Sequence, residues 1–217
     1  MIESVEGMLS TGQKGSVREK CAFRYIYAME KKSILFISCG IFKEELEYLV
    51  REKVLDLKVL FLDAALHVNF DRLKERLVQA LEEQRKEGTE LKVLYGHCHP
   101  EIMEIVKRYG AKKIDAANCL EAIVGREEIR RIDSEAKTFF LTAGWVNNWE
   151  SMFALGKEDF QFDFSSMFGQ YKRVMVFDTG VIPIDEDKVR QFSKLTNLPV
   201  ERRRISLDHL LDLTTCL

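Results

Sequence analysis

The feature that most constrains this chain is a regular alternation between short apolar runs and longer segments with helical spacing. In the run SILFIS (33–38), four apolar residues stand in succession, which is typical of a strand buried on both faces of a parallel sheet. After Gly40, the next segment instead places Phe42, Leu46 and Leu49 on one face of a helix. Strands that alternate with helices in this way form parallel sheets with right-handed crossovers, so the pattern predicts an α/β fold.

The same alternation continues along the chain and predicts seven strands. The six further runs lie at 57–63, 91–96, 112–116, 137–144, 172–180 and 198–206. We therefore predict a Rossmann-like single α/β domain over residues 33–217, with a mostly parallel sheet and helices on both faces. Residues 1–32 lack periodicity, and a flexible N-terminal extension is expected there. The aromatic-rich stretch 145–171 does not fit one strand–helix unit, and we expect helices that cover the sheet or line a pocket.

The charge and cysteine content exclude several classes of protein. A net charge of -2 and a pI near 6.2 argue against a nucleic-acid-binding protein, which needs a basic surface. No apolar run approaches the ~20 residues that cross a bilayer, so no membrane association is expected. The N-terminus lacks the apolar region of a secretory signal. We therefore expect a cytoplasmic protein whose five cysteines are reduced thiols.

Three of these cysteines occupy equivalent positions in the predicted fold. Cys39 follows the first strand, Cys98 follows the third, and Cys119 follows the fourth. In parallel sheets, ligands bind beyond the carboxyl ends of the strands, and these ends meet at one edge. The sequence therefore predicts that three sulfur atoms from separate strands converge on one crevice.

Other unusual residues fall at the same predicted edge. His67 lies just past the second strand, and Asp178 ends the sixth strand as a candidate functional carboxylate. The residues expected to line a cofactor pocket beside the thiols are Gly40, Gly96, Gly144 and Trp145. Neither SCG nor DTG forms a dinucleotide or P-loop fingerprint, so nucleotide binding is not expected.

Thiolate and imidazole ligands favour soft metals, which points to zinc, iron or an iron–sulfur cluster. In this hypothesis the metal ligands are Cys39, Cys98, Cys119 and His67, with His97 or His99 as alternatives for the fourth position.

Two other hypotheses fit the same residues. In the first, Cys98 is an acid–base or nucleophilic thiol of a metal-independent enzyme, assisted by Asp178 and acting on a small molecule. In the second, the cysteines are packing residues, and the aromatic stretch 145–171 is the partner surface of an accessory protein. The aromatic stretch is also compatible with a homodimer.

The ordered motifs SCG, LDAALH, YGHC, NCLEAIVG, LTAGW and FDTG resemble an uncharacterised family, domain-of-unknown-function family 1638. The resemblance runs from about Ser33 to about Leu207. It implies an origin in methanogenic archaea or anaerobic bacteria, often beside corrinoid-dependent methyltransferase systems, and a site at the motif positions. From it we expect a soft-metal, iron–sulfur or metallo-cofactor binding protein of one-carbon metabolism or methanogenesis. Its expected partners are a small molecule or metallo-cofactor and a corrinoid protein or methyltransferase.

This chain departs from the family pattern at two places. His99-Pro100 follows the second cysteine, where relatives carry glycine or another small residue. Ala117-Asn118 precedes the third cysteine, where relatives carry a His-Asp pair. A ligand relocated within one site and a change to a different ligand are both consistent with these departures, so the fourth ligand stays open.

Overall fold

The computed structural model describes residues 33–154 and 164–215, and all seven predicted strands lie within them. Every strand pairing is parallel, and helices flank the sheets, so the predicted α/β class is confirmed. The predicted extension at 1–32 lies outside the described residues. No helix in the described part of the chain is long and apolar enough to cross a membrane.

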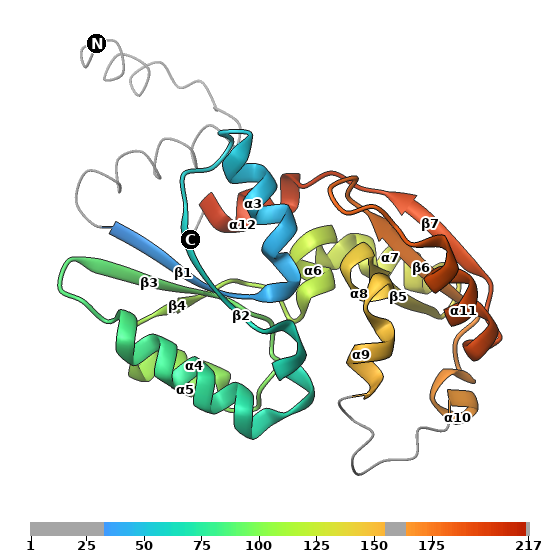
Figure 1. Ribbon diagram of the computed structural model, residues 1–217, viewed down its shortest axis with the longest axis horizontal. Helices are drawn as coiled ribbons and strands as arrows, with labels where there is room; N and C mark the ends of the chain where they lie inside the picture. Colours follow the sequence, from blue (N-terminus) through green and yellow to red (C-terminus); the bar gives the residue numbers. More distant parts are fainter. Residues whose placement is uncertain (1–32, 155–163, 216–217) are drawn as a thin grey trace.

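The strands form two sheets, where the sequence pattern predicted one. The first sheet has the order β2 (Lys58–Leu62), β1 (Ser33–Cys39), β3 (Thr89–Leu94), β4 (Lys112–Lys113). The second has the order β5 (Thr138–Thr142), β6 (Arg173–Asp178), β7 (Val200–Arg204). Figure 1 shows the two sheets as neighbouring halves of the molecule. Hydrophobic periodicity marks which residues form strands but not which strands pair, so the break after β4 has no local signal.

Helices cover both faces of the four-stranded sheet. α4 (Phe70–Gln84) and α5 (Ile102–Arg108) lie on one face, and α3 (Lys43–Arg51) and α12 (Asp208–Thr215) lie on the other (Figure 1). Each of these helices buries an apolar stripe, for example Leu73, Leu77 and Leu81 on α4. Short 3-10 segments, η1 (Gly40–Phe42) and η2 (Ala64–Val68), follow β1 and β2.

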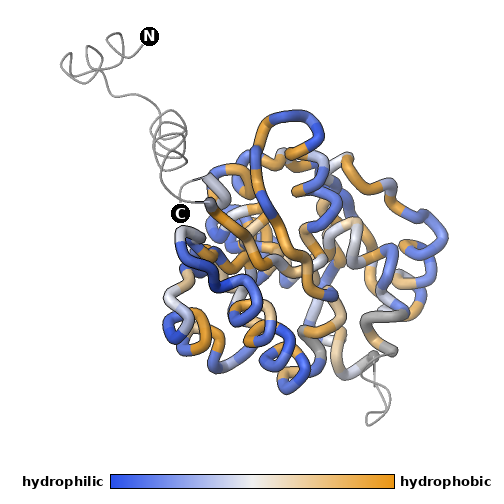
Figure 2. Tube along the Cα trace, turned by 60° about the vertical axis from the view of Figure 1, so that its left-hand side comes forward, coloured by the Kyte–Doolittle hydropathy of each residue, from blue (hydrophilic) through white to orange (hydrophobic). Residues whose placement is uncertain are grey.

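The chain joins the two sheets through helices twice, once before β5 and once after β7. α6 (Cys119–Val124) and α7 (Arg126–Glu135) lead from β4 to β5. After β7 the chain returns to the first half, where α12 packs against α6. Leu210 of α12 is fully buried in the same core as Phe36 of β1. Figure 2 shows apolar stretches along the inner strands and hydrophilic residues on the outer helices.

The aromatic-rich stretch forms helices that cover the second sheet, as predicted for the residues described there. These helices are α8 (Ala143–Asn147), α9 (Trp149–Ala154) and α10 (Phe164–Phe168), and α11 (Glu186–Thr196) lies beside them. Phe168 is buried and contacts Phe139 edge-to-face, with ring centroids 4.7 Å apart. Because these rings form a core, the described part of this stretch is mainly a packing element.

Candidate functional site

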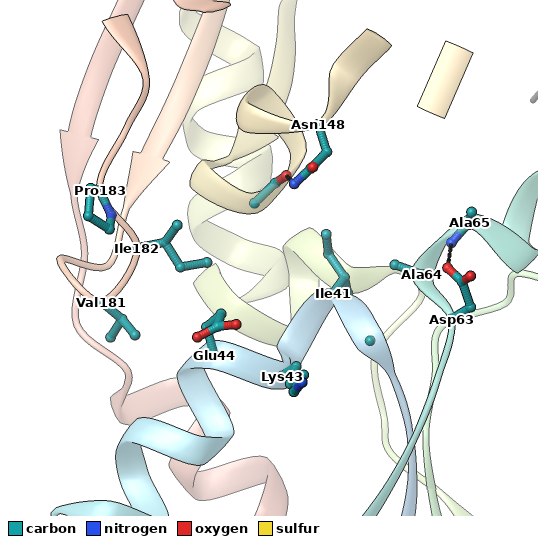
Figure 3. Close-up of a pocket in the computed structure, with 12 residues that line it drawn as sticks. Ile41, Lys43, Glu44, Asp63, Ala64, Ala65, Asn148, Val181, Ile182 and Pro183 are labelled. Carbon is teal, nitrogen blue, oxygen red and sulfur yellow. Dashed lines mark hydrogen bonds between the residues drawn. The ribbon is translucent and has the colours of Figure 1, made fainter. Parts of the chain in front are cut away.

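A cleft of about 440 Å³ lies at the carboxyl ends of strands from both sheets. The residues lining it come from the segments that follow β1, β2, β5 and β6, including the first turns of α3 and α8: Gly40, Ile41, Lys43, Glu44, Asp63, Ala64, Ala65, Gly144, Asn148, Val181, Ile182 and Pro183. Figure 3 shows Ile41 and Ile182 pointing into this inter-sheet cleft, with Asn148 and Glu44 on opposite sides. A cleft of this size at strand ends is suited to a small molecule.

A second, smaller pocket of about 220 Å³ adjoins this cleft and contains the three predicted cysteines. We call it the cysteine pocket, and the residues lining it are Cys39, Ile41, Phe42, Ala64, Tyr95, Gly96, Cys98, Asn118, Cys119 and Trp145. It shares Ile41 and Ala64 with the inter-sheet cleft. The predicted convergence of thiols from three strand ends is therefore observed.

Close backbone approach brings Cys98 and Cys119 to the same pocket. Gly96 precedes Cys98, and a Cβ atom on it would lie 2.4 Å from the carbonyl oxygen of Ala117 and 2.5 Å from Cα of Asn118. Only glycine fits there without displacing backbone. The Asn118 side chain in turn accepts a hydrogen bond from the Glu121 backbone amide and caps α6, which begins at Cys119.

Gly40 has the same function in the turn that follows Cys39. A Cβ atom at Gly40 would lie 2.8 Å from the carbonyl oxygen of Leu62 and 3.2 Å from the backbone nitrogen of Ala64. The glycine therefore lets the ends of β1 and β2 approach each other. Of the three glycines predicted to line a cofactor pocket, Gly96 lines the cysteine pocket, and Gly40 and Gly144 line the cleft beside it.

Lys113 of β4 stabilises the two segments that lead to Cys98 and Cys119 in the cysteine pocket. Its ammonium group donates hydrogen bonds to the carbonyl oxygens of Tyr95 at 3.1 Å, Ile114 at 2.7 Å and Ala116 at 2.9 Å. These charge-assisted bonds join the end of β3 to the segment before α6. The sequence analysis missed this residue because a lysine in the short run KKIDA looks like an ordinary solvent-exposed charge.

Burial keeps the thiols of the cysteine pocket in their neutral form. It raises the pKa of Cys39 to about 12, against the opposing effect of a hydrogen bond from the Ile41 backbone. It likewise raises the pKa of Cys119 to about 11, with the neighbouring Cys98 adding to the rise. The pKa of Cys98 is also raised by burial. At neutral pH these three groups are therefore thiols rather than thiolates.

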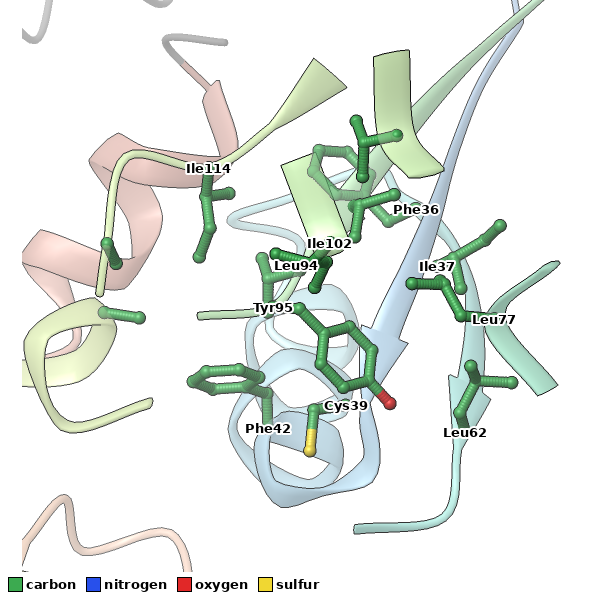
Figure 4. Packing of buried hydrophobic residues seen from close by; sticks show 14 of the residues in the cluster. Phe36, Ile37, Cys39, Phe42, Leu62, Leu77, Leu94, Tyr95, Ile102 and Ile114 are labelled. Carbon is green, nitrogen blue, oxygen red and sulfur yellow. The ribbon is translucent and has the colours of Figure 1, made fainter. Parts of the chain in front are cut away.

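Tyr95 is the second residue that the sequence analysis missed. It directly follows β3, is 1% exposed and lines the cysteine pocket. Figure 4 shows its hydroxyl beside the sulfur of Cys39. Burial, with the charges of Cys39 and Cys98, raises the pKa of this hydroxyl, which therefore stays protonated. Among the described residues its side-chain hydrogen-bond partner is the Cys39 sulfur, a weak acceptor, and it has no oxygen or nitrogen partner.

The family model described as Protein of unknown function (DUF1638) matches residues 61–214. The chain belongs to this family. No curated protein and no solved structure gives a significant match. The DUF1638 match includes Cys98 and Cys119 and begins after Cys39. The family inferred from the strand-end motifs is therefore confirmed, over a range that begins later than the motifs indicated.

The histidines beside Cys98 do not line the cysteine pocket of this DUF1638 protein. His97 is exposed, whereas His99 is buried and its Nδ1 accepts a hydrogen bond from the Glu101 backbone at 3.0 Å. The His99 ring meets Phe70 edge-on, with centroids 5.9 Å apart. His67 lies in η2 after β2, and its side chain is outside the described residues.

Asp178, proposed from the sequence as a functional carboxylate, lines neither the cysteine pocket nor the inter-sheet cleft. Its Oδ2 accepts a hydrogen bond from Arg204 at 3.0 Å, and its Oδ1 accepts one from the Gly180 backbone at 2.7 Å. Asp178 therefore fixes the turn after β6. Trp145 lines the cysteine pocket as predicted, and Gly144 lines the inter-sheet cleft.

Among the described side chains, no three His, Cys, Asp or Glu residues are arranged to hold one metal ion. The three thiols nevertheless line one pocket. The ligand set of Cys39, Cys98, Cys119 and His67 stays a prediction for this DUF1638 protein.

Proposed function

We propose that the cysteine pocket binds a soft metal centre, and that this centre is an iron–sulfur cluster. The observation that carries the proposal is the convergence of Cys39, Cys98 and Cys119 on one pocket of about 220 Å³. Thiolates are the ligands of iron–sulfur clusters and of other soft metals. Because each cysteine follows a different strand, the fold itself holds the set together.

The raised pKa values of the thiols favour a metal-binding site over a site with a nucleophilic cysteine. A cysteine nucleophile reacts as its thiolate, so reactive cysteines have lowered pKa values. In this pocket burial raises the pKa of Cys39 to about 12 and that of Cys119 to about 11. A bound metal cation would displace the thiol protons and compensate the sulfur charges.

The arrangement of the ligands favours a cluster over a single ion. Three thiolates bound to one zinc ion each lie ~2.3 Å from it, so their sulfur atoms must crowd around one point. No three described His, Cys, Asp or Glu side chains have that arrangement. A cluster distributes its cysteines over several iron atoms and therefore accepts sulfur atoms that are further apart. The Tyr95 hydroxyl has no oxygen or nitrogen partner among the described residues, which also fits a pocket where a metal-bound thiolate is its acceptor.

In this proposal Cys39, Cys98 and Cys119 hold the cluster, and His67 is the candidate fourth ligand. A cluster held by three cysteines supplies electron transfer or an iron position that can bind a small molecule. Ile41 and Ala64 form the boundary with the inter-sheet cleft, which gives such a molecule space beside the pocket. A role in anaerobic one-carbon metabolism, with a corrinoid protein or methyltransferase as partner, is a further prediction from the family resemblance.

The test is to purify the protein without oxygen, incubate it with iron and sulfide, and measure both elements and the visible absorption spectrum. Wild-type protein is expected to bind iron and sulfide in equal amounts. Cys39→Ser, Cys98→Ser and Cys119→Ser are each expected to lose most of both. Cys216→Ser is the matched control, because this cysteine follows none of the predicted strands, and it should bind as much as wild type.

Three results would count against the proposal. Zinc or iron bound without sulfide would indicate a single-ion site. Metal-free protein with one rapidly alkylated cysteine would favour the cysteine-enzyme hypothesis. Equal loss of iron in Cys216→Ser and in the three pocket variants would show that binding is unspecific.

A further inference from the structure

The Tyr95 hydroxyl is a buried hydrogen-bond donor whose side-chain partner in the described pocket is the Cys39 sulfur, a weak acceptor. The side chain is 1% exposed, and its oxygen makes no hydrogen bond to an oxygen or nitrogen of any described residue. Buried hydroxyls are nearly always paired, since leaving one unpaired costs free energy. A buried hydroxyl that faces only a weak sulfur acceptor therefore indicates that this sulfur becomes a stronger acceptor when the pocket binds its ligand.

The sulfur of Cys39 lies within interaction range of this hydroxyl. Cys39 and Tyr95 directly follow Ser38 and Leu94, which are register partners in the pairing of β1 with β3. Both residues line the cysteine pocket, and Figure 4 shows the Tyr95 oxygen beside the Cys39 sulfur. A neutral thiol is a weak acceptor, whereas an ionised sulfur accepts strong, charge-assisted hydrogen bonds.

We propose that Tyr95 donates a hydrogen bond to the Cys39 sulfur when that sulfur binds the metal centre as a thiolate. This inference rests on the proposed function, and it makes Tyr95 a positioning residue rather than a ligand. Hydrogen bonds to cluster sulfurs raise the reduction potential, because they stabilise the extra negative charge of the reduced state. They also orient the ligand and strengthen metal binding.

The Tyr95 backbone is held in place independently of any ligand. Its carbonyl oxygen accepts a hydrogen bond from Lys113 at 3.1 Å, and the next residue is Gly96, whose close approach to Ala117 fixes the turn. The buried ring restricts the hydroxyl to few positions. A donor fixed in advance loses little entropy when the acceptor forms, which favours a hydrogen bond to a thiolate at this position.

Tyr95→Phe tests the inference, because it removes the hydroxyl and keeps the ring. Tyr109→Phe is the matched control, since the Tyr109 hydroxyl bonds Glu82 and does not line the pocket. After anaerobic loading with iron and sulfide, Tyr95→Phe is expected to have a more negative reduction potential than wild type. It should also lose iron to a chelator about 10- to 100-fold faster. Tyr109→Phe should match wild type in both measurements.

A second substitution distinguishes loss of the hydrogen bond from a structural effect of Tyr95→Phe. Site-specific 3-fluorotyrosine at position 95 keeps the hydroxyl and makes it a stronger donor, so the potential should shift in the positive direction. Unchanged potentials and unchanged iron loss in both variants would overturn the Tyr95 assignment and leave the cluster proposal standing. A wild-type protein that binds no iron would overturn both proposals.

Discussion

The backbone amide of His97 donates a hydrogen bond of 2.6 Å to the carbonyl oxygen of Ala117. This bond joins the turn after β3, which carries Cys98, to the segment before α6, which begins at Cys119. The geometry of the cysteine pocket therefore depends on the contact of two turns. Gly96 permits this contact, because it has no side chain on the crowded side.

Gly96→Ala is expected to destabilise the protein and to disturb the pocket. The added Cβ would lie 2.4 Å from the Ala117 oxygen and 2.5 Å from Cα of Asn118, so backbone atoms must move. The expected loss is about 1–3 kcal/mol in the free energy of unfolding, measured with urea. Gly144→Ala is the control, since its nearest contacts would be at 3.6 Å and little change is expected. Equal stability of Gly96→Ala and wild type would refute the role assigned to Gly96.

Lys113→Met is expected to lower stability more than the same change in its neighbour. Lys113 donates to three backbone carbonyls, whereas Lys112 is exposed and pairs with Glu90. Hydrogen bonds from charged groups contribute about 1.5–3 kcal/mol, and exposed ion pairs about 0–1 kcal/mol. In urea unfolding, Lys113→Met should have a clearly lower free energy of unfolding than Lys112→Met. Similar values for the two variants would show that the Lys113 bonds are not needed to hold the turn.

Glu45 is expected to make stability depend on pH. This carboxyl is 1% exposed, accepts a hydrogen bond from Thr179 at 3.3 Å, and has a pKa that burial raises above its ordinary 4.5. Between the unfolded and folded pKa values the folded state binds more protons, so this group's contribution to stability falls as the pH rises.

Glu45→Gln is therefore expected to be more stable than wild type at about pH 8, with a difference that shrinks as the pH falls towards 4.5. Urea unfolding at several pH values measures this, and Glu47→Gln, at an exposed position of the same helix, serves as the control. A difference that instead grows with acidity would contradict the assigned direction of the pKa shift.

The thiols of the metal-free pocket are expected to react slowly. With pKa values raised to about 12 and about 11, Cys39 and Cys119 hold far less thiolate at mildly alkaline pH than an ordinary cysteine. Alkylation with iodoacetamide should be slower than for a short cysteine peptide by on the order of 100-fold or more. Mass spectrometry of each site measures the rates, and the urea-unfolded protein should react at the peptide rate. A pocket cysteine that is alkylated faster than the cysteine peptide would support the hypothesis of a metal-independent cysteine enzyme.

The parts of the site that follow from strand order could be predicted from the sequence. Cys39, Cys98 and Cys119 each follow a strand, and parallel strands bring such positions to one edge. The division into two sheets could not be predicted, because strand pairing is a tertiary property. For the same reason the ion pair of Asp178 with Arg204, which the register of β6 with β7 places opposite it, could not be predicted.

The most direct test of the central claim is X-ray absorption at the iron edge of anaerobically loaded protein. If Cys39, Cys98 and Cys119 hold one cluster, each iron should have sulfur neighbours in its first shell and further iron atoms in the next shell. Both shells should disappear in the Cys98→Ser variant. An iron bound by nitrogen and oxygen without iron neighbours, or no bound iron, would contradict the account.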